Sequence, residues 1–103
     1  MGLFSSFFGK KQQKLDDFFS RDAVIIDVRS KAEYDNGAIP GSKHIPLQTI
    51  NSNSEKIKSW EAPIICVCAS GARSASATAI LKSKGIEAIN GGGWLSLYKK
   101  MNT

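Results

Sequence analysis

Two continuous, largely apolar runs constrain the fold of this 103-residue chain more than any other feature of its sequence. Residues 23–28 read Ala-Val-Ile-Ile-Asp-Val, and residues 64–68 read Ile-Ile-Cys-Val-Cys. A strand that lacks the alternation of apolar and polar residues is buried on both of its faces. Such strands are typical of a parallel sheet that helices cover on both sides. The two runs therefore indicate an α/β fold.

The segment that follows the second run supports this fold class. Residues 74–84 place Ala77, Ile80 and Leu81 on one helical face, and Gly85 stands where a helix commonly ends. A shorter apolar run follows at residues 86–89. Strand, helix and strand with short links form a right-handed crossover unit. We therefore expect a three-layer fold, in which a small central parallel sheet is flanked by helices on both faces.

Three further segments are assigned from their residue types. A short helix is expected from Gln12, with Leu15, Phe18 and Phe19 on one face. Residues 37–41 read Gly-Ala-Ile-Pro-Gly and predict a turn, which a short strand at residues 42–45 follows. Residues 47–57 are expected to form a loop that leads into a helix.

Composition excludes several classes of site. Two cysteines one residue apart do not make a disulfide framework, and one histidine without a CxxC motif leaves no obvious zinc site. Free thiols point to a reducing, cytoplasmic setting. The formal net charge is +5, but the lysines are scattered, with no long basic block. We therefore expect a bias toward small anions and acidic partners, and no nucleic-acid binding.

The N-terminal segment differs from the rest of the chain. We expect residues 1–14 to form an apolar and basic tail, either flexible or interfacial, and residues 15–103 to form the folded domain. The apolar stretch of residues 1–14 is too short to span a bilayer. Lysines follow this stretch instead of preceding it, which is unlike a signal peptide. One interpretation is peripheral membrane contact through Phe4, Phe7 and Phe8, with the lysines outside. The alternative, which we favour, is that these phenylalanines cover the domain's own core or fray.

The candidate site is the segment that follows the second buried run. A cysteine ends the strand, small residues follow, and an arginine stands where a helix begins; these residues are Cys68, Ala69, Ser70, Gly71, Ala72, Arg73 and Ser74. Ligands of parallel sheets bind beyond the carboxyl ends of the strands. A loop of small residues can direct successive N–H groups at one point, which favours a thiolate at Cys68. Arg73 would either hydrogen-bond loop carbonyls or bind the anion bidentately.

This loop and four further motifs occur in the order and spacing typical of one family, so the chain resembles the single-domain rhodaneses of the sulfurtransferase family. The resemblance covers roughly residues 15–101. Asp-Val-Arg at residues 27–29 matches the family's pattern after the first buried strand, and Glu33 and Tyr34 match its acidic-aromatic pair. Residues 37–46 match its Gly-His-Ile-Pro-Gly segment, with Ala38 in place of histidine. Residues 92–94, Gly-Gly-Trp, match its late diglycine-aromatic turn.

The resemblance implies a persulfide mechanism. Cys68 would take sulfur from a donor such as thiosulfate, a polysulfide or a protein persulfide, and pass it to cyanide, a thiol or a protein. No metal or organic cofactor is implied. The loop has one residue fewer between cysteine and arginine than the loops of rhodanese-like phosphatases, which favours sulfur over phosphate. Residues 69, 70 and 72 carry no charge, unlike many efficient thiosulfate sulfurtransferases, so thiosulfate is expected to be a poor donor.

Supporting roles and alternatives remain open at this stage. Asp27 and Arg29 are expected to tie turns together, and His44 to cap a strand end. Cys66 lies on the same side of its strand as Cys68, so it is either a resolving thiol or, as we favour, a small buried hydrophobe. Besides the sulfurtransferase, the chain could be a rhodanese-like interaction module or a redox sensor oxidised at Cys68. The sequence does not specify the donor, the acceptor, the pathway or the oligomeric state.

Overall fold

The fold is built on a four-stranded sheet in the order β2-β1-β3-β4. A computed structural model describes residues 3–102 of the chain, with the side chains of residues 9–102. Every neighbouring pair of strands is parallel. The strands are β1 (Val24–Asp27), β2 (Lys43–His44), β3 (Ile64–Cys68) and β4 (Ala88–Gly93). The two continuous apolar runs thus form the two central strands, as their composition predicts.

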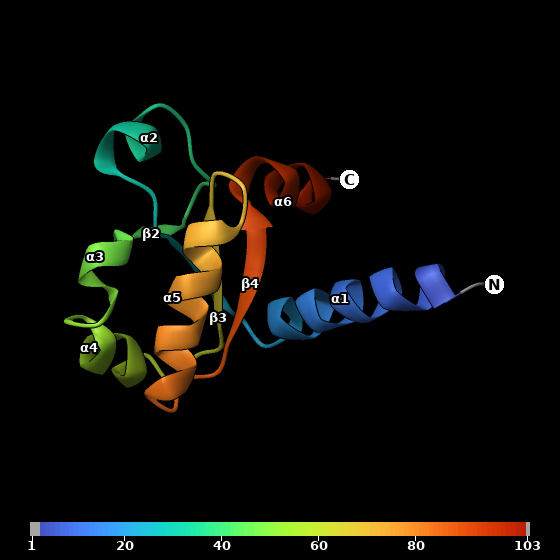
Figure 1. The fold of residues 1–103 in the computed structure, drawn as a ribbon, viewed down its shortest axis with the longest axis horizontal. Helices are drawn as coiled ribbons and strands as arrows, with labels where there is room; N and C mark the ends of the chain where they lie inside the picture. The colour runs from blue at the N-terminus through green and yellow to red at the C-terminus, as the bar shows by residue number, and fades with distance from the viewer. Residues whose placement is uncertain (1–2, 103) are drawn as a thin grey trace.

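Helices cover both faces of the sheet, which gives the three layers expected from the sequence (Figure 1). The helices are α1 (Leu3–Ser20), α2 (Lys31–Asp35), α3 (Leu47–Ile50), α4 (Ser54–Ser59), α5 (Ala72–Ser83) and α6 (Trp94–Met101). Side chains that alternate along β3 enter two separate cores. Ile64, Cys66 and Cys68 pack in the core that includes residues of α3, α4 and α5, whereas Ile65 and Val67 pack with residues of α1 and α6.

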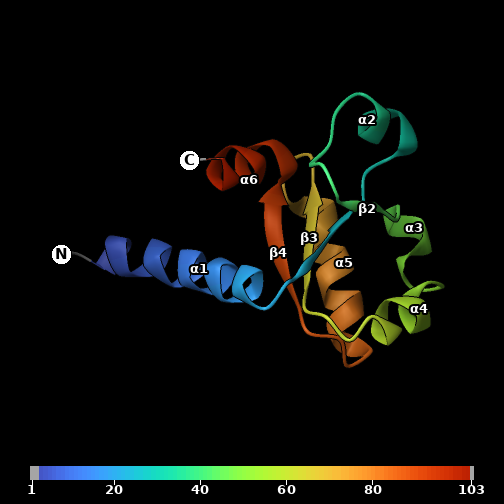
Figure 2. The same ribbon diagram turned by 180° about the vertical axis from the view of Figure 1, so that it is seen from behind.

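Helix α1 is longer than the sequence suggested. It begins at Leu3 and not at Gln12, and it continues without a break past residue 14, where we expected a tail to end. No proline interrupts this segment, and a single glycine at position 9 costs a helix only about 1 kcal/mol. Leu15 and Phe18 are buried against the sheet, whereas the N-terminal half of α1 projects past β4 (Figures 1 and 2).

The proposed membrane contact falls outside what the structure describes. The side chains of Phe4, Phe7 and Phe8 precede residue 9, the first whose side chain is described. Within residues 3–102, none of the helices combines the length and the hydropathy needed to cross a bilayer.

Two other segments differ in detail from the sequence-based assignment. Residues 47–57, expected to be a loop leading into a helix, form the two short helices α3 and α4. Strand β4 begins later than expected and runs on through the glycines to Gly93, with an irregularity in its pairing opposite Cys66 and Val67. Glycine has low strand propensity, so composition alone does not extend a strand through Gly91–Gly93.

Candidate active site

The candidate nucleophile lies where a parallel α/β sheet normally carries its site. Cys68 is the last residue of β3, and three residues connect it to α5. The residue is 1% exposed, so little of it is in contact with solvent. Gly71 stands at the N-cap of α5 with a φ of 110°, a left-handed conformation that side chains rarely adopt. Gly71 thus turns the loop into α5.

Polar groups of the loop converge on the Cys68 sulfur. The backbone N–H of Gly71 donates to Sγ at 3.0 Å and that of Ser74 at 3.3 Å, while the Ser74 hydroxyl lies 3.2 Å from Sγ. Burial by itself raises the pKa of the Cys68 thiol. The hydrogen bonds from the Ser74 hydroxyl and from the backbone N–H groups of Ser74, Gly71 and Ser70 outweigh it and hold that pKa below its usual value.

Asn90 supports this arrangement from β4, and the sequence analysis did not identify it. Its Oδ1 accepts a hydrogen bond of 2.6 Å from the Ser74 hydroxyl and one of 2.9 Å from the N–H of Gly92, while its Nδ2 donates to the carbonyl of Gly71. The Ser74 proton thus has two acceptors within reach, Asn90 and Sγ. A thiolate is charged and is the stronger acceptor, so ionisation of Cys68 draws this proton toward sulfur.

The glycines before α6 allow β4 to approach the loop. A Cβ at Gly93 would lie 2.8 Å from the carbonyl oxygen of Ala69, and one at Gly91 would lie 2.7 Å from a methyl group of Ile65. Side chains at either position would push β4 away from β3 and the loop. Gly91, and Gly93 of the late diglycine motif, are therefore required sterically for this close packing.

Arg73 is paired with an acidic residue that its sequence neighbourhood did not indicate. Its guanidinium forms a bidentate pair with the carboxylate of Glu33, at 2.7 Å and 2.9 Å. This pair is the main reason that the pKa of Glu33 falls to about 2, and Glu33 also closes the capping box of α2 with Ser30. Arg73 thus connects α5 to α2, and its charge also interacts with Cys68. The groups that hydrogen-bond to Sγ are the Ser74 hydroxyl and backbone N–H groups, and binding of an anion by Arg73 stays a prediction.

Asp27 and Arg29 form a buried ion pair at the carboxyl end of β1. Arg29 Nη2 lies 2.7 Å from Asp27 Oδ2, and the two side chains are 5% and 0% exposed. Arg29 also donates to the carbonyl of Gly37 and stacks on the Trp94 ring, 4.7 Å from its centroid. His44 Nε2 lies 2.7 Å from the carbonyl oxygen of Arg29. These contacts connect the segment after β1 with Gly37, Trp94 and the end of β2. None of them involves Sγ of Cys68.

The second cysteine is in a different chemical environment. Cys66 is fully buried on the same face of β3 as Cys68, and both thiols are free. Burial raises the pKa of Cys66 to about 11. At neutral pH Cys66 is therefore a neutral, apolar side chain, which fits the role of a small hydrophobe better than that of a resolving thiol.

We expect Ser74→Ala to slow alkylation of Cys68 by iodoacetamide at neutral pH. A hydrogen bond to a charged group contributes about 1.5–3 kcal/mol, so losing the hydroxyl should reduce the alkylation rate at least about tenfold. The pKa of Cys68 rises in this variant, so the midpoint of the rate against pH should move to higher pH. Ser70→Ala is the matched control, because its hydroxyl is exposed and is not among the groups bonded to Sγ. Equal profiles for both variants would contradict this role of Ser74.

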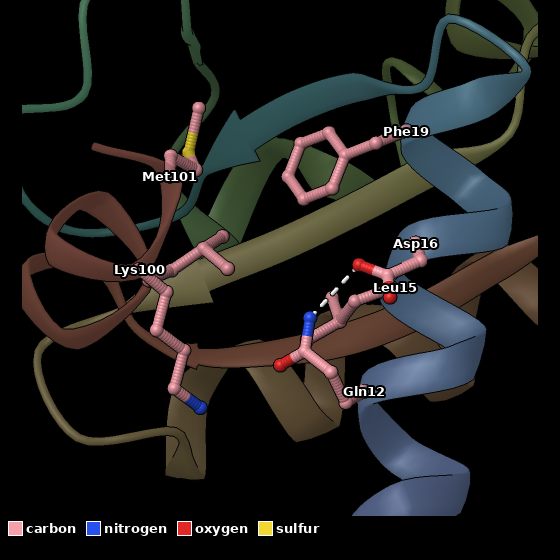
Figure 3. Close-up of a pocket in the computed structure, with 7 residues that line it drawn as sticks. Gln12, Leu15, Asp16, Phe19, Lys100 and Met101 are labelled. Atoms are coloured by element: carbon pink, nitrogen blue, oxygen red, sulfur yellow. Dashed lines mark hydrogen bonds between the residues drawn. The ribbon is translucent and has the colours of Figure 1, made fainter. Parts of the chain in front are cut away.

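A cavity of the described chain lies apart from the Cys68 loop. A cavity of about 290 Å³ between α1 and α6 is lined by Leu15, Phe19 and Met101, among others (Figure 3). Beside it, Gln12 donates a hydrogen bond to Asp16. The cavity includes no cysteine and none of the loop residues. Within residues 3–102, no three His, Cys, Asp or Glu side chains come together as a potential metal site.

Comparisons with known proteins agree with the fold. The sequence model of the "Rhodanese-like domain" family matches residues 11–99. A "Thiosulfate sulfurtransferase GlpE" from Pseudomonas fluorescens is 35% identical over 81 residues, which are 74% of this chain and 73% of that protein. The crystal structure of a rhodanese-like domain protein from Staphylococcus aureus superposes with a TM-score of 0.64 at 36% identity, covering 74% of each chain.

Some relatives are much longer than this chain. A "tRNA sulfurtransferase" from Desulfurococcus amylolyticus is 31% identical over 83 residues, which are 81% of this chain but only 16% of that protein. Similarity to such a protein therefore concerns one of its parts.

Proposed function

Because this chain belongs to the rhodanese-like domain family, we propose that it is a sulfurtransferase or sulfur carrier in which Cys68 holds the transferred sulfur as a persulfide. The observation that supports this most is the convergence of the Ser74 hydroxyl and the N–H groups of Gly71 and Ser74 on Sγ. These groups favour a thiolate, which is the nucleophile that sulfur transfer requires.

In the first half of the reaction, the Cys68 thiolate attacks the outer sulfur of a donor. A new S–S bond forms to Sγ, the bond between the outer sulfur and the rest of the donor breaks, and the donor leaves with the electron pair of that bond. The product on the protein is Cys68–S–S⁻. In the second half, a thiolate or cyanide attacks the outer sulfur and Cys68 leaves as a thiolate. The reaction invokes no separate general base, because the hydrogen bonds to Sγ lower the pKa of Cys68 and so favour its thiolate.

The lining of the loop favours one class of donor. Ala69, Ser70 and Ala72 carry no charge, and Glu33 neutralises the guanidinium of Arg73. Within the loop itself, backbone dipoles are then the main attraction for an anion, and they suit one sulfur carrying a single negative charge. We propose a polysulfide or a protein persulfide as the physiological donor, and thiosulfate, a dianion, as a weaker one.

The same thiolate could serve a redox sensor, but the second cysteine argues against that function. A sensor commonly has a resolving thiol beside the oxidised cysteine. Cys66 has a pKa of about 11 and is buried, so little of it is ionised and available to attack oxidised Cys68.

Intact-protein mass spectrometry tests the proposed function. Reduced protein incubated with polysulfide is expected to gain the mass of one sulfur atom, which cyanide then removes. Peptide fragmentation should place the added sulfur on Cys68 and not on Cys66. Thiosulfate should load a smaller fraction of the protein under the same conditions. Loading that is absent with both donors, although Cys68 alkylates readily, would rule the proposal out.

A further inference from the structure

A groove lies beside the active-site loop, at the open edge of the sheet. The N-terminal half of α1 extends past β4, the last strand at this edge (Figures 1 and 2). The space between them has a volume of about 780 Å³. Lys10, Lys11 and Lys14 of α1 line one side, and Ile89 and Asn90 of β4 line the other. This volume is much larger than a small sulfur anion requires.

The charge of the groove is strongly positive. None of the ion pairs formed by the described residues includes Lys10, Lys11 or Lys14. Among the described residues of the lining, the single acidic one, Asp17, is paired with Arg21. Three uncompensated ammonium groups around one groove create a potential that attracts carboxylates and accelerates their association. The formal net charge of +5 opposes occupation by a second copy of this chain.

The strand beside the groove can accept an extended chain. Within residues 3–102, β4 pairs with β3 on one side and with no strand on the other. An edge strand offers unpaired backbone N–H and C=O groups, which is the basis of peptide binding by strand addition. Ile89 supplies an apolar contact on the same side. These properties fit a polypeptide better than an isolated ion.

The groove is connected to Cys68 through two residues of β4. Asn90 lines the groove and also holds Ser74 and the carbonyl of Gly71. Gly92 lies against Gly71, since a Cβ on Gly71 would be 3.5 Å from the Gly92 Cα. Lys11 Nζ lies 3.9 Å from the place of a Cβ at Gly92. A chain bound in the groove therefore runs directly beside the loop that surrounds Sγ.

From these observations we infer that the groove binds an acidic, extended segment of the protein that takes sulfur from Cys68, an inference that rests on the proposed function. The bound segment holds its cysteine near the loop. Its thiolate attacks the outer sulfur of Cys68–S–S⁻, the S–S bond to Sγ breaks, and Cys68 leaves as a thiolate. The product is a persulfide on the partner, so no oxidant or reductant is consumed.

Binding and sulfur transfer are measured separately with two synthetic peptides. Each peptide contains one cysteine, and the residues around it are glutamates in one and glutamines in the other. Binding to the reduced protein is followed by fluorescence anisotropy of labelled peptides whose cysteine is replaced by serine. Transfer is followed by mass spectrometry of protein loaded with polysulfide. A failure of loading concerns only the proposed function, because the binding measurement involves no sulfur chemistry.

The decisive comparison uses two variants with the same change in charge. One carries Lys10→Ala, Lys11→Ala and Lys14→Ala; the other carries Lys56→Ala, Lys82→Ala and Lys84→Ala, which alter exposed lysines of α4 and of the segment around the end of α5. In the natural protein at low salt, the glutamate peptide should bind and react roughly tenfold better than the glutamine peptide. The groove variant should lose this ratio, the control variant should keep it, and added salt should reduce it.

Three results would overturn the inference. The first is equal binding of both peptides to the natural protein. The second is an equal loss of the ratio in both triple variants, which would mean attraction by net charge alone. The third is a dimer of the natural protein that the groove substitutions dissociate, which would assign the groove to a second copy of the chain.

Discussion

Asp27→Asn is expected to destabilise the protein by roughly 3–5 kcal/mol, because it leaves the guanidinium of Arg29 buried without a countercharge. Asparagine keeps the size of the side chain, so packing changes little. Arg29 cannot turn toward solvent easily, since it is also bonded to the carbonyl of Gly37 and stacked on Trp94. A typical domain has only about 5–15 kcal/mol of stability, so a large part of it would be lost. Urea unfolding followed by circular dichroism measures the change.

The control is an ion pair at the surface that also contains an aspartate. Lys31 and Asp35 lie 2.6 Å apart on α2, but their side chains are 80% and 56% exposed. Surface pairs contribute less than about 1 kcal/mol, so Asp35→Asn should change the free energy of unfolding only slightly. Similar losses of unfolding free energy in the two variants would show that burial does not make the Asp27 pair more important for stability.

Cys68→Ser is expected to reduce sulfur loading and transfer to the level observed without protein. A serine hydroxyl does not ionise near neutral pH and cannot form a persulfide, whatever hydrogen bonds surround it. Serine is close to cysteine in size and can bond to Ser74, so the fold should persist. Thermal unfolding checks the fold, and mass spectrometry after incubation with polysulfide checks the loading.

The other cysteine provides the control for this experiment. Cys66→Ala removes a thiol from the same strand and the same face, two residues away. It leaves a small cavity, so some stability is lost, but Cys68 and its donors remain in place. Loading should therefore persist in Cys66→Ala. If it disappears there and survives in Cys68→Ser, the sulfur is carried by the buried cysteine and the proposed mechanism is wrong.

The sequence predicted those parts of the fold that depend on local composition. The apolar runs at residues 23–28 and 64–68 are short and rich in β-branched residues, which favours buried strands. The carboxyl end of the second run then places Cys68 at the edge where parallel sheets carry their sites. Gly71 turns the chain into α5 and Gly85 follows the end of that helix, and both have a positive φ, as expected of glycine at these positions.

The parts that the sequence did not predict depend on contacts between distant segments. Arg73 and Glu33 are separated by 40 positions, and nothing near either residue specifies the other as its partner. Asn90 lies 16 positions from Ser74 and contacts it only because β4 pairs with β3. The extent of α1 was missed for a different reason. Phe4, Phe7 and Phe8 stand at the i, i+3, i+4 spacing of a helical face, but polar residues at positions 10–14 separate them from Leu15. This polar stretch suggested a tail, whereas the helix runs through it without a break.

The hydrogen bonds to Sγ also couple the acidity of Cys68 to the folding of the chain. In the unfolded chain Ser74 and Asn90 are no longer held beside the thiol, so Cys68 regains an ordinary pKa. By linkage, a group whose pKa is lower in the folded state adds stability at pH values above its unfolded pKa and loses that contribution as the pH falls through its folded pKa. The anion at Cys68 therefore stabilises the folded chain, and an unfolded chain carries no activated thiol that could react with the wrong partner.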